Sequence, residues 1–572
     1  MTTMPPILKG RRTALLARLI ANGVASALLM VAVALLIKQL FDSFITASPE
    51  AGFEQLVWYG VGLFVAALCL AGLSVLERVD AEKMGQDFTH EVRLGLFAHM
   101  SRLAPRELQK RSRGGVLLRF IGDLTALRQW VSLGVARLSV ASITVIITLL
   151  ALSFISIPLA FSAGIFMFAG TAVAVGLGKW LQTTMREARR RRAYLAANVT
   201  EKISALGVVQ VHGQTRREKR RVRRQSRRLV QAMVARARAI GLLRGIVELT
   251  SALASGVVLL LGAVLVAKGQ ATPGTVVAAM SIVGLLTPAL RDMGRVQEYW
   301  HGAVVSREKI GSFLEMNPLD KKAAHRKARL KKGPGRVSFD NVSVTGSLQG
   351  FSAEAKAGQV IALVGANGSG KSTLLALVAR LIDAEQGRLM IDGQNIARVS
   401  LASLRRAVGL ASPELPLLRG TIERNLRYRL PDASDEKVAE VQALCGIDSL
   451  LHELPDGINT RVTEDGANLS LGQRQRLALA RAILGKPRIL LLDEMDANLD
   501  QYAGDALRSV LNNYEGTVIM VSHRPDWVAM ADTVWHLRDG RLLEQGPPAE
   551  LLQGDGPTAT LFQRPRLVVN GT

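Results

Sequence analysis

The residues best suited to chemistry stand in one glycine-rich stretch of the C-terminal half. The stretch has the pattern glycine, four variable residues, glycine, lysine, serine, and it stands between a strand-like run, 359–364, and a helical run, 374–381. Such a loop wraps backbone N–H groups around phosphates at a helix N-terminus, while lysine reaches the β- and γ-oxygens and the hydroxyl ligates Mg²⁺. We therefore predict a nucleotide phosphate-binding loop, with a purely structural turn as the weaker interpretation. Its members are Gly365, Ala366, Asn367, Gly368, Ser369, Gly370, Lys371, Ser372 and Thr373.

Two adjacent carboxylates, Asp493 and Glu494, follow the apolar run 489–492. Four apolar residues predict a buried strand, and open α/β sheets bind ligands at the carboxyl ends of their strands. Asp493 would hold Mg²⁺ together with Ser372, and Glu494 would orient or deprotonate an attacking water. Many structural strands also end in an acidic residue, so this prediction depends on the neighbouring motifs.

Three further motifs complete an ordered series. Residues 469–473 read Leu-Ser-Leu-Gly-Gln and run into a helical stretch, 498–500 read Asn-Leu-Asp, and 521–523 read Val-Ser-His. With the phosphate loop and the Asp-Glu strand, this order resembles the nucleotide-binding domain of ABC transporters. Residues 114–123 and the layout of apolar runs resemble the membrane half of an ABC exporter. The resemblance implies ATP hydrolysis that drives transport by a half-transporter, which needs a second copy or a partner.

The resemblance also implies roles for individual residues. Ser470, Gly472 and Gln473 of one subunit would contact ATP held by the phosphate loop of the other, with ATP and Mg²⁺ as cofactors. The electropositive N-terminus of the helix at Ser470 suits a phosphate on independent physical grounds. His523 would be the switch residue that senses the γ-phosphate and orients water. The implied assembly is a dimer, and we favour a homodimer over a heterodimer.

The sequence departs from the family pattern at three positions. Gly346 stands where the family places an aromatic residue that stacks on adenine, and Pro413 stands where it places a glutamine that links Mg²⁺ to the membrane domain. Leu471 replaces a glycine of the signature and adds bulk beside the expected phosphate path. We therefore expect weak base selectivity and a coupling contact that does not use a glutamine side chain.

The elements that must position these motifs include a membrane domain, because the chain of 572 residues is 49% hydrophobic. About 20 apolar residues cross a hydrocarbon core. One charge-free run is long enough for two spans, with Pro158 near its middle, and Gly269 with Pro273 predicts a turn between the last two runs. Six transmembrane helices are therefore expected. They correspond to the runs 19–37, 56–76, 138–178 as two spans, 249–267 and 269–290.

Loop charge predicts the orientation of these spans. The loop after the first span carries acidic residues, whereas the segments 78–137 and 186–244 are long and strongly basic. By the positive-inside rule the basic segments face the cytoplasm, as helices that continue beyond the bilayer, and both termini lie there too. We predict a multi-pass integral protein of the bacterial plasma (inner) membrane. The turns at 104–115 and 207–215 are expected to dock on the ATPase domain.

The formal net charge of +25 raises nucleic acid as an alternative partner. The arginines are not interleaved with aromatic residues, so we favour membrane lipid headgroups and expect no nucleic acid. Cys69 and Cys445 are the only cysteines in the sequence, which excludes a disulfide framework and a cysteine metal site.

The predicted fold is a polytopic α-helical membrane domain with long cytoplasmic extensions, followed by an α/β P-loop ABC ATPase domain. The expected bounds are 1–315 for the six-helix domain, 316–336 for a basic linker and 337–572 for the ATPase domain. The leading interpretation of function is ATP-driven export of an unidentified substrate. The alternative is a weakly hydrolysing regulatory or partner subunit of a heterodimer. The exporter is favoured by retention of four residues that catalysis needs, Lys371, Asp493, Glu494 and His523.

Overall fold

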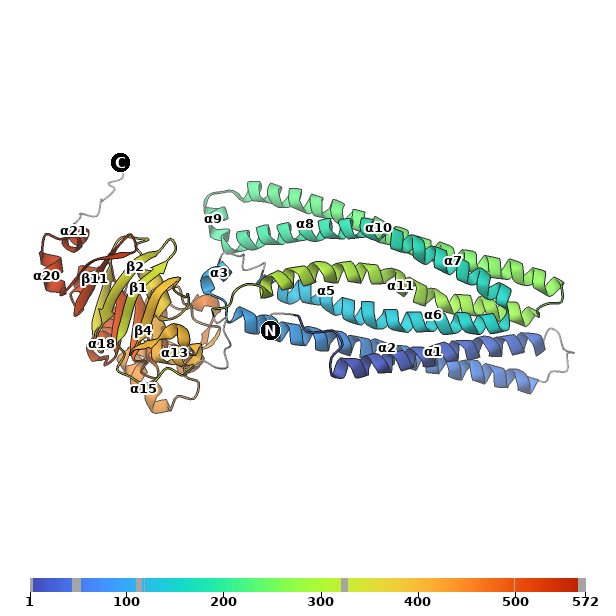
Figure 1. The fold of residues 1–572 in the computed structure, drawn as a ribbon, viewed down its shortest axis with the longest axis horizontal. Helices are drawn as coiled ribbons and strands as arrows, with labels where there is room; N and C mark the ends of the chain where they lie inside the picture. Colours follow the sequence, from blue (N-terminus) through green and yellow to red (C-terminus); the bar gives the residue numbers. More distant parts are fainter. Residues whose placement is uncertain are drawn as a thin grey trace. The chain divides into compact units, whose positions relative to one another are not determined.

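The structure is a computed structural model that describes residues 4–43, 53–109, 116–117, 119–319, 328–497 and 499–563. These residues form two compact units (Figure 1). The N-terminal unit comprises Met1–Leu103 and Glu107–Met316, and the C-terminal unit comprises Ala104–Arg106 and Asn317–Thr572. Asn498, residues 320–327 of the expected linker and most of 110–118 lie outside the described residues.

The N-terminal unit is built from long helices that run side by side (Figure 1). At 1.5 Å per residue, the longest helix is about 80 Å long, which far exceeds a hydrocarbon core of about 30 Å. This length is what the prediction of helices that continue beyond the bilayer requires. The elements are α1 Arg11–Phe41, α2 Phe53–Met100, α3 Pro105–Gln109, η2 Arg119–Asp123, α5 Leu124–Gln129, η3 Trp130–Val135, α6 Ala136–Ile155, α7 Ile157–Gly176, α8 Gly178–Ser204, α9 Leu206–Val211, α10 Thr215–Ala267 and α11 Pro273–Leu314.

Four helical segments are long and apolar enough to span a membrane: Arg11–Phe41, Glu54–Met100, Arg119–Ile155 and Thr215–Ala267. Two shorter apolar helical segments, Ile157–Gly170 and Pro273–Ala289, coincide with the fourth and sixth expected spans. The chain is therefore an integral, multi-pass membrane protein, and the count of six stays a prediction.

The helices break where the sequence predicts turns. Ser156 adopts an extended conformation between α6 and α7, so that Pro158 falls in the first turn of α7, where its missing N–H costs nothing. α10 ends at Ala267, Gly269 has a φ of 71°, and the Thr272 hydroxyl caps α11 by accepting from the N–H of Thr275 at 3.2 Å.

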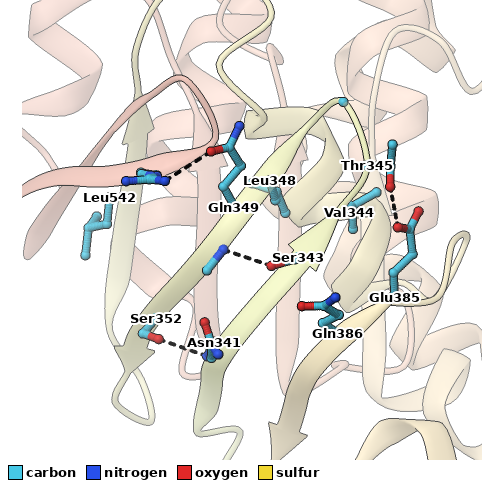
Figure 2. Close-up of a pocket in the computed structure, with 13 residues that line it drawn as sticks. Asn341, Ser343, Val344, Thr345, Leu348, Gln349, Ser352, Glu385, Gln386 and Leu542 are labelled. Atoms are coloured by element: carbon cyan, nitrogen blue, oxygen red, sulfur yellow. Dashed lines mark hydrogen bonds between the residues drawn. The ribbon is translucent and has the colours of Figure 1, made fainter.

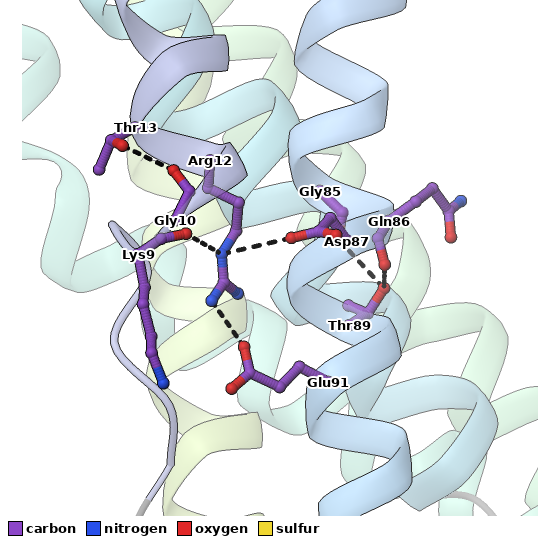
Figure 3. Close-up of polar contacts among 9 residues, drawn as sticks. All are labelled: Lys9, Gly10, Arg12, Thr13, Gly85, Gln86, Asp87, Thr89 and Glu91. Carbon is purple, nitrogen blue, oxygen red and sulfur yellow. Dashed lines mark hydrogen bonds and ion pairs between the residues drawn. The ribbon is translucent and has the colours of Figure 1, made fainter.

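A buried arginine joins the first helix to the extension of the second (Figure 3). The side chain of Arg12 is only 2% exposed, and its Nη2 lies 2.6 Å from Glu91 Oε2 while its Nε lies 3.5 Å from Asp87 Oδ2. The guanidinium also lies 5.4 Å from the ring centre of Phe88. Because a buried charge is costly unless it is paired, these carboxylates hold the start of α1 against α2.

The C-terminal unit contains a six-stranded sheet with the order β12-β11-β3-β10-β9-β6. The pairs from β11 to β6 are all parallel, whereas β12 is antiparallel to β11, so the expectation of a largely parallel sheet is confirmed. Ala362 and Leu490 belong to the apolar cluster on one face, and Ile361 and Leu491 to that on the other. Burial on both faces explains the continuous apolar runs of these strands. The strands are β3 Val360–Val364, β6 Val408–Ala411, β9 Ile489–Asp493, β10 Thr517–Val521, β11 Thr533–Arg538 and β12 Arg541–Gly546.

The unit also contains a four-stranded antiparallel sheet with the order β2-β1-β4-β5 and a two-stranded sheet, β7-β8. Its strands are β1 Val337–Val344, β2 Leu348–Ala355, β4 Gln386–Ile391 and β5 Gln394–Asn395, and the small pair is β7 Gly420–Thr421 and β8 Arg461–Val462. The helices of this unit are α12 Lys371–Val378, α13 Leu401–Ala407, α14 Ile422–Leu426, α15 Asp435–Leu444, α16 Ile447–Glu453, α17 Leu471–Ile483, α18 Gln501–Asn513, α19 Pro525–Val528, α20 Pro548–Gln553 and α21 Pro557–Gln563.

Candidate functional site

The predicted phosphate-binding loop connects β3 to α12. Gly365, Gly368 and Gly370 have φ values of 144°, 82° and 107°, which L side chains rarely adopt. A Cβ atom at Gly365 would lie 2.2 Å from the carbonyl oxygen of Leu537, so space as well as conformation demands glycine there. These conformations bend the loop around the N-terminus of α12, where a phosphate would be bound.

Lys371, the first residue of α12, turns back onto the loop. Its Nζ donates to the carbonyl oxygens of Gly365 at 2.7 Å and Ala366 at 3.0 Å, and the residue is 6% exposed. Burial lowers the pKa of Lys371, while the charges of Glu494 and Asp493 oppose that shift. The ammonium group therefore stiffens the loop and lies where it adds positive charge to a bound phosphate.

One hydroxyl group in the loop has no partner among the described residues. Ser369 is 5% exposed, and its Oγ makes no hydrogen bond there. A buried, unpaired hydroxyl costs about 1–3 kcal/mol. A phosphate oxygen in the loop would satisfy it, so this residue fits the predicted ligand.

Ser372 and Asp493 meet at the carboxyl edge of the sheet. The Ser372 hydroxyl donates to Asp493 Oδ1 at 3.3 Å. Burial raises the pKa of Asp493 to about 6, aided by the charges of Glu494 and Glu414, whereas the hydrogen bond from Ser372 lowers it. One hydroxyl and one carboxylate fit Mg²⁺, which commonly takes few protein ligands and fills its shell with phosphate oxygens and water. Among the described residues no cluster of three His, Cys, Asp or Glu side chains could hold a metal alone.

Glu494 and His523 lie close together after the carboxyl ends of the neighbouring strands β9 and β10. Glu494 has a φ of 51°, an uncommon conformation for a residue other than glycine, and it follows β9 directly. Its Oε1 lies 3.5 Å from Nε2 of His523, which follows β10. Both side chains are about half exposed, at 50% and 43%. The pair is thus accessible to water and is held next to the Ser372–Asp493 contact.

Asp496 is a supporting residue that the sequence motifs did not single out. It is 5% exposed, and its Oδ2 accepts a 2.6 Å hydrogen bond from the hydroxyl of Ser522. The same hydroxyl accepts from the N–H of Arg524 at 3.1 Å, which fixes the backbone on both sides of His523. The signal in the sequence is a third acidic residue, two positions after the Asp-Glu pair, at the start of the loop that leaves β9.

The signature residues begin α17 with a reciprocal cap. The Ser470 hydroxyl accepts from the N–H of Gln473 at 3.1 Å, and Gln473 Oε1 accepts from the N–H of Ser470 at 3.0 Å. Of the four free N–H groups at a helix start, this cap leaves those of Leu471 and Gly472. Leu471 is 40% exposed. No hydrogen bond or ion pair joins the described residues of 469–473 to those of 365–373 within the chain, so Ser470, Gly472 and Gln473 form a separate surface.

Gly346 stands where the family places an aromatic residue, and the surface around it is an open, polar cavity of about 810 Å³. The cavity lies over β1, β2 and the start of β4 (Figure 2). Gly346, at a φ of 74° in the turn between β1 and β2, lines it. Next along the chain, the Ser347 carbonyl oxygen would lie 2.7 Å from a Cβ at Gly370, so this turn borders the phosphate loop. The described residues that line the cavity carry polar and aliphatic side chains, and none is aromatic.

Pro413 lies two residues beyond β6 and is exposed. The adjacent turn is held by backbone groups and a buried hydroxyl: the N–H of Glu414 donates to Ser412 Oγ at 3.2 Å, and the N–H of Leu415 to the Ser412 carbonyl at 3.0 Å. The loop shape is therefore set locally. The charge of Glu414 raises the pKa of Asp493, which marks Glu414 as a second residue near the site that the motifs did not predict.

Comparison with known families matches both units. The family model described as ABC transporter matches residues 348–497, and the model described as ABC transporter transmembrane region matches residues 19–290. The first match contains the loop 365–373, the signature and the Asp-Glu strand. The predicted ABC-type fold, a helical membrane domain followed by an α/β ATPase domain, is confirmed.

Individual relatives cover almost the whole chain. An ABC transporter ATP-binding protein of Bacillus subtilis is 30% identical over 540 residues, which is 92% of this chain and 87% of the relative. An ATP-dependent lipid A-core flippase of Chromobacterium violaceum is 28% identical over 548 residues, covering 93% and 91% of the two chains. A solved structure of a bacterial Atm1-family ABC exporter with ATP bound matches with a TM-score of 0.86 at 25% identity, over 97% of this chain and 99% of that chain.

Sequence motifs, fold and relatives agree on the architecture. A membrane domain and an ATPase domain in one chain constitute half of a transporter, which acts together with another half. The chain belongs to the ABC transporter family, as a half-transporter of the exporter type.

Proposed function

We propose that two copies of this chain form an exporter in which each ATP is held between the phosphate loop of one copy and the signature of the other. ATP-driven export follows from the family, and the alternative of a weakly hydrolysing partner subunit is not favoured. The observation that carries the assignment of hydrolysis is the contact of Glu494 with His523, beside Asp493. A homodimer is favoured because this one chain supplies every residue type that the site needs.

Each residue has a defined task in hydrolysis. The loop amides and Lys371 bind and orient the phosphates, and the amides of Leu471 and Gly472 supply positive partial charge from the second copy. Glu494 accepts a proton from the attacking water, and His523 donates a hydrogen bond on the γ-phosphate side while contacting Glu494. Ser372 and Asp493 would hold Mg²⁺, which neutralises charge on the phosphates when it is bound.

The proposed topology places both termini and the basic helix extensions in the cytoplasm of a bacterium, with the spans in its inner membrane. The charge asymmetry of the loops supports this orientation, as does the bacterial source of the relatives above. We retain 1–315 as the membrane domain, 316–336 as a basic linker and 337–572 as the ATPase domain. The basic extensions would also meet anionic lipid headgroups near the bilayer surface.

The test of this assignment is ATP turnover by the purified chain in detergent. Glu494→Gln keeps the side-chain shape but removes the base, so ATP should bind while turnover falls by roughly 10²–10⁴-fold. Lys371→Ala removes a phosphate contact and should weaken ATP binding itself. Glu550→Gln, an exposed glutamate on α20, is the matched control and should keep the wild-type rate.

Two outcomes would contradict the proposal. Turnover of Glu494→Gln within a factor of two of wild type would remove the catalytic role of Glu494. A wild-type chain that hydrolyses ATP only after a different half-transporter is added would show that the working assembly is a heterodimer.

A further inference from the structure

A second cavity, of about 420 Å³, lies wholly within the N-terminal unit, between η2 and α5 on one side and α8, α10 and α11 on the other. Six charged side chains line its wall among polar and apolar residues. The cations are Arg189, Arg192, Arg236 and Lys309, and the anions are Asp123 and Glu298. The wall therefore carries a formal excess of two positive charges.

Both carboxylates in the wall already have partners. Glu298 Oε1 lies 2.5 Å from Nη2 of Arg236, and neither side chain of this pair is more than 29% exposed. Asp123 accepts from the Ser306 hydroxyl at 3.0 Å and lies 3.9 Å from Nζ of Lys309. These contacts neutralise Arg236 and Lys309, so the excess charge resides on the two remaining arginines.

Arg189 and Arg192 have no carboxylate within ion-pair distance among the described residues. Nη1 of Arg189 donates to the carbonyl oxygen of Gly302 at 3.0 Å, and Nη2 of Arg192 reaches only the sulfur of Met233, at 3.9 Å. Three positions apart on α8, the two guanidinium groups share one helix face and repel each other. Burial lowers the pKa of Arg189, and the positive charges of Arg236 and Arg192 add to that shift, whereas the charges of Asp123 and Glu298 oppose it.

The site lies beyond the apolar part of the membrane domain. The charge-free run ends at Gly178, and Arg189 is 189 − 178 = 11 residues further along α8, or about 16 Å at 1.5 Å per residue. At that distance the arginines are outside the hydrocarbon and open to a ligand in water. Met185 and Met233 add an apolar, adaptable wall beside the charges.

We propose that this cavity binds an organic anion that carries a phosphate or carboxylate group next to a nonpolar portion, with Arg189 and Arg192 as the anion-binding residues. Guanidinium groups bind such oxygens through paired N–H donors, and one anion bridging both arginines would remove their repulsion. The claim that this anion is the exported substrate rests on the proposed function. The claim that the cavity binds an organic anion does not.

The experiment measures binding of hexyl phosphate to the full-length protein in detergent without ATP, by isothermal titration calorimetry, with hexylammonium as the cationic counterpart. The double variant R189Q/R192Q should bind hexyl phosphate at least tenfold more weakly than wild type. The matched control R186Q/R190Q removes two exposed charges of the same helix that do not line the cavity, and its affinity should stay within twofold. R192Q alone, which loses only an exposed side chain, should fold normally and show a partial loss.

Three outcomes would overturn the proposal: equal affinity in wild type and R189Q/R192Q, an equal loss in the control, or equally tight binding of hexylammonium. Nanodiscs distinguish a lipid from a soluble anion as the source of the ligand. If phosphatidylglycerol weakens hexyl phosphate binding to wild type, relative to phosphatidylcholine alone, the site accepts a lipid headgroup; no difference assigns it to soluble anions. Because binding is measured without ATP, a failed hydrolysis test leaves this result intact.

Discussion

A Cβ atom at Gly472 would lie 1.9 Å from Oδ2 of Asp500. The other oxygen of Asp500, Oδ1, accepts from the N–H of Ala503 at 2.7 Å and caps α18. The first turn of the signature helix α17 therefore packs directly against the aspartate that caps α18. This contact within one chain requires glycine at position 472 whether or not a phosphate is bound.

Gly472→Ala should accordingly displace Asp500 and weaken the cap of α18. We expect a loss of about 1–2 kcal/mol, the scale of a lost N-terminal cap, together with reduced ATP turnover. Thermal unfolding of G472A, D500A and the double variant measures this loss of stability. The double variant should lose less stability than the sum of the two single losses. Gly504→Ala on α18 meets no atom within 4 Å and serves as the control. Additive losses would show that the two residues do not interact.

The raised pKa of Asp493 predicts a pH-dependent gain of stability in Asp493→Asn. The carboxyl group has an ordinary pKa of 3.8 and one of about 6 in the folded chain, so its contribution to stability is full below 3.8 and is lost as the pH rises through 6. In nucleotide-free protein with EDTA, Asp493→Asn should raise the unfolding temperature by about 2–4 °C at pH 7.5 and by roughly half as much at pH 5, because pH 5 already lies inside the window between the two pKa values. In a separate assay with ATP and Mg²⁺, Asp493→Asn should lose hydrolysis at both pH values. A gain at pH 5 alone would reverse the sign and refute the argument.

The absence of an aromatic residue at Gly346 predicts weak discrimination between bases. Without a stacking ring, the triphosphate supplies most of the binding free energy. GTP should compete with ATP within about tenfold, a difference of roughly 1.4 kcal/mol. Competition assays with labelled ATP measure this ratio. A much larger preference for ATP in the wild type would mean that another residue recognises the base.

The exposed apolar side chains of the short helix α9 predict the contact that couples ATP hydrolysis to transport. Leu206, Val208 and Val211 are 52%, 60% and 83% exposed, an apolar surface at the turn between α8 and α10. If this surface docks on an ATPase domain, Val211→Asp places an unpaired charge in the contact and should separate ATP hydrolysis from transport in proteoliposomes. Val230→Asp, at a 57% exposed valine of α10, is the control and should leave the two coupled.

The same model of coupling makes a prediction for Pro413. Since the turn after β6 is held by backbone groups and by Ser412, Pro413→Gln should leave ATP turnover largely intact. Full coupling in Val211→Asp would exclude 207–215 as a coupling element. A large change of turnover in Pro413→Gln would show instead that this position contacts the catalytic groups.

The sequence by itself determined the features that depend on neighbouring residues. The phosphate loop is one, because the φ angles of Gly365, Gly368 and Gly370 and the start of α12 follow from nine consecutive residues. Apolar runs long enough to cross a bilayer, and buried strands such as β3 and β9, are also local patterns. These patterns predicted the helical membrane domain, the largely parallel sheet and the ABC family, which the fold and the comparisons confirm.

Only the tertiary structure decided which distant residues meet. Ser522 lies 26 positions from Asp496, and Arg236 lies 62 from Glu298, yet each pair is in hydrogen-bond contact. No local spacing encodes these pairs, since they form only when separate helices and strands pack against each other. The packing of Gly472 on Asp500 and the arginine-lined cavity arise in the same way. Packing decides which charged groups form ion pairs and which, such as Arg189, donate instead to a backbone carbonyl oxygen.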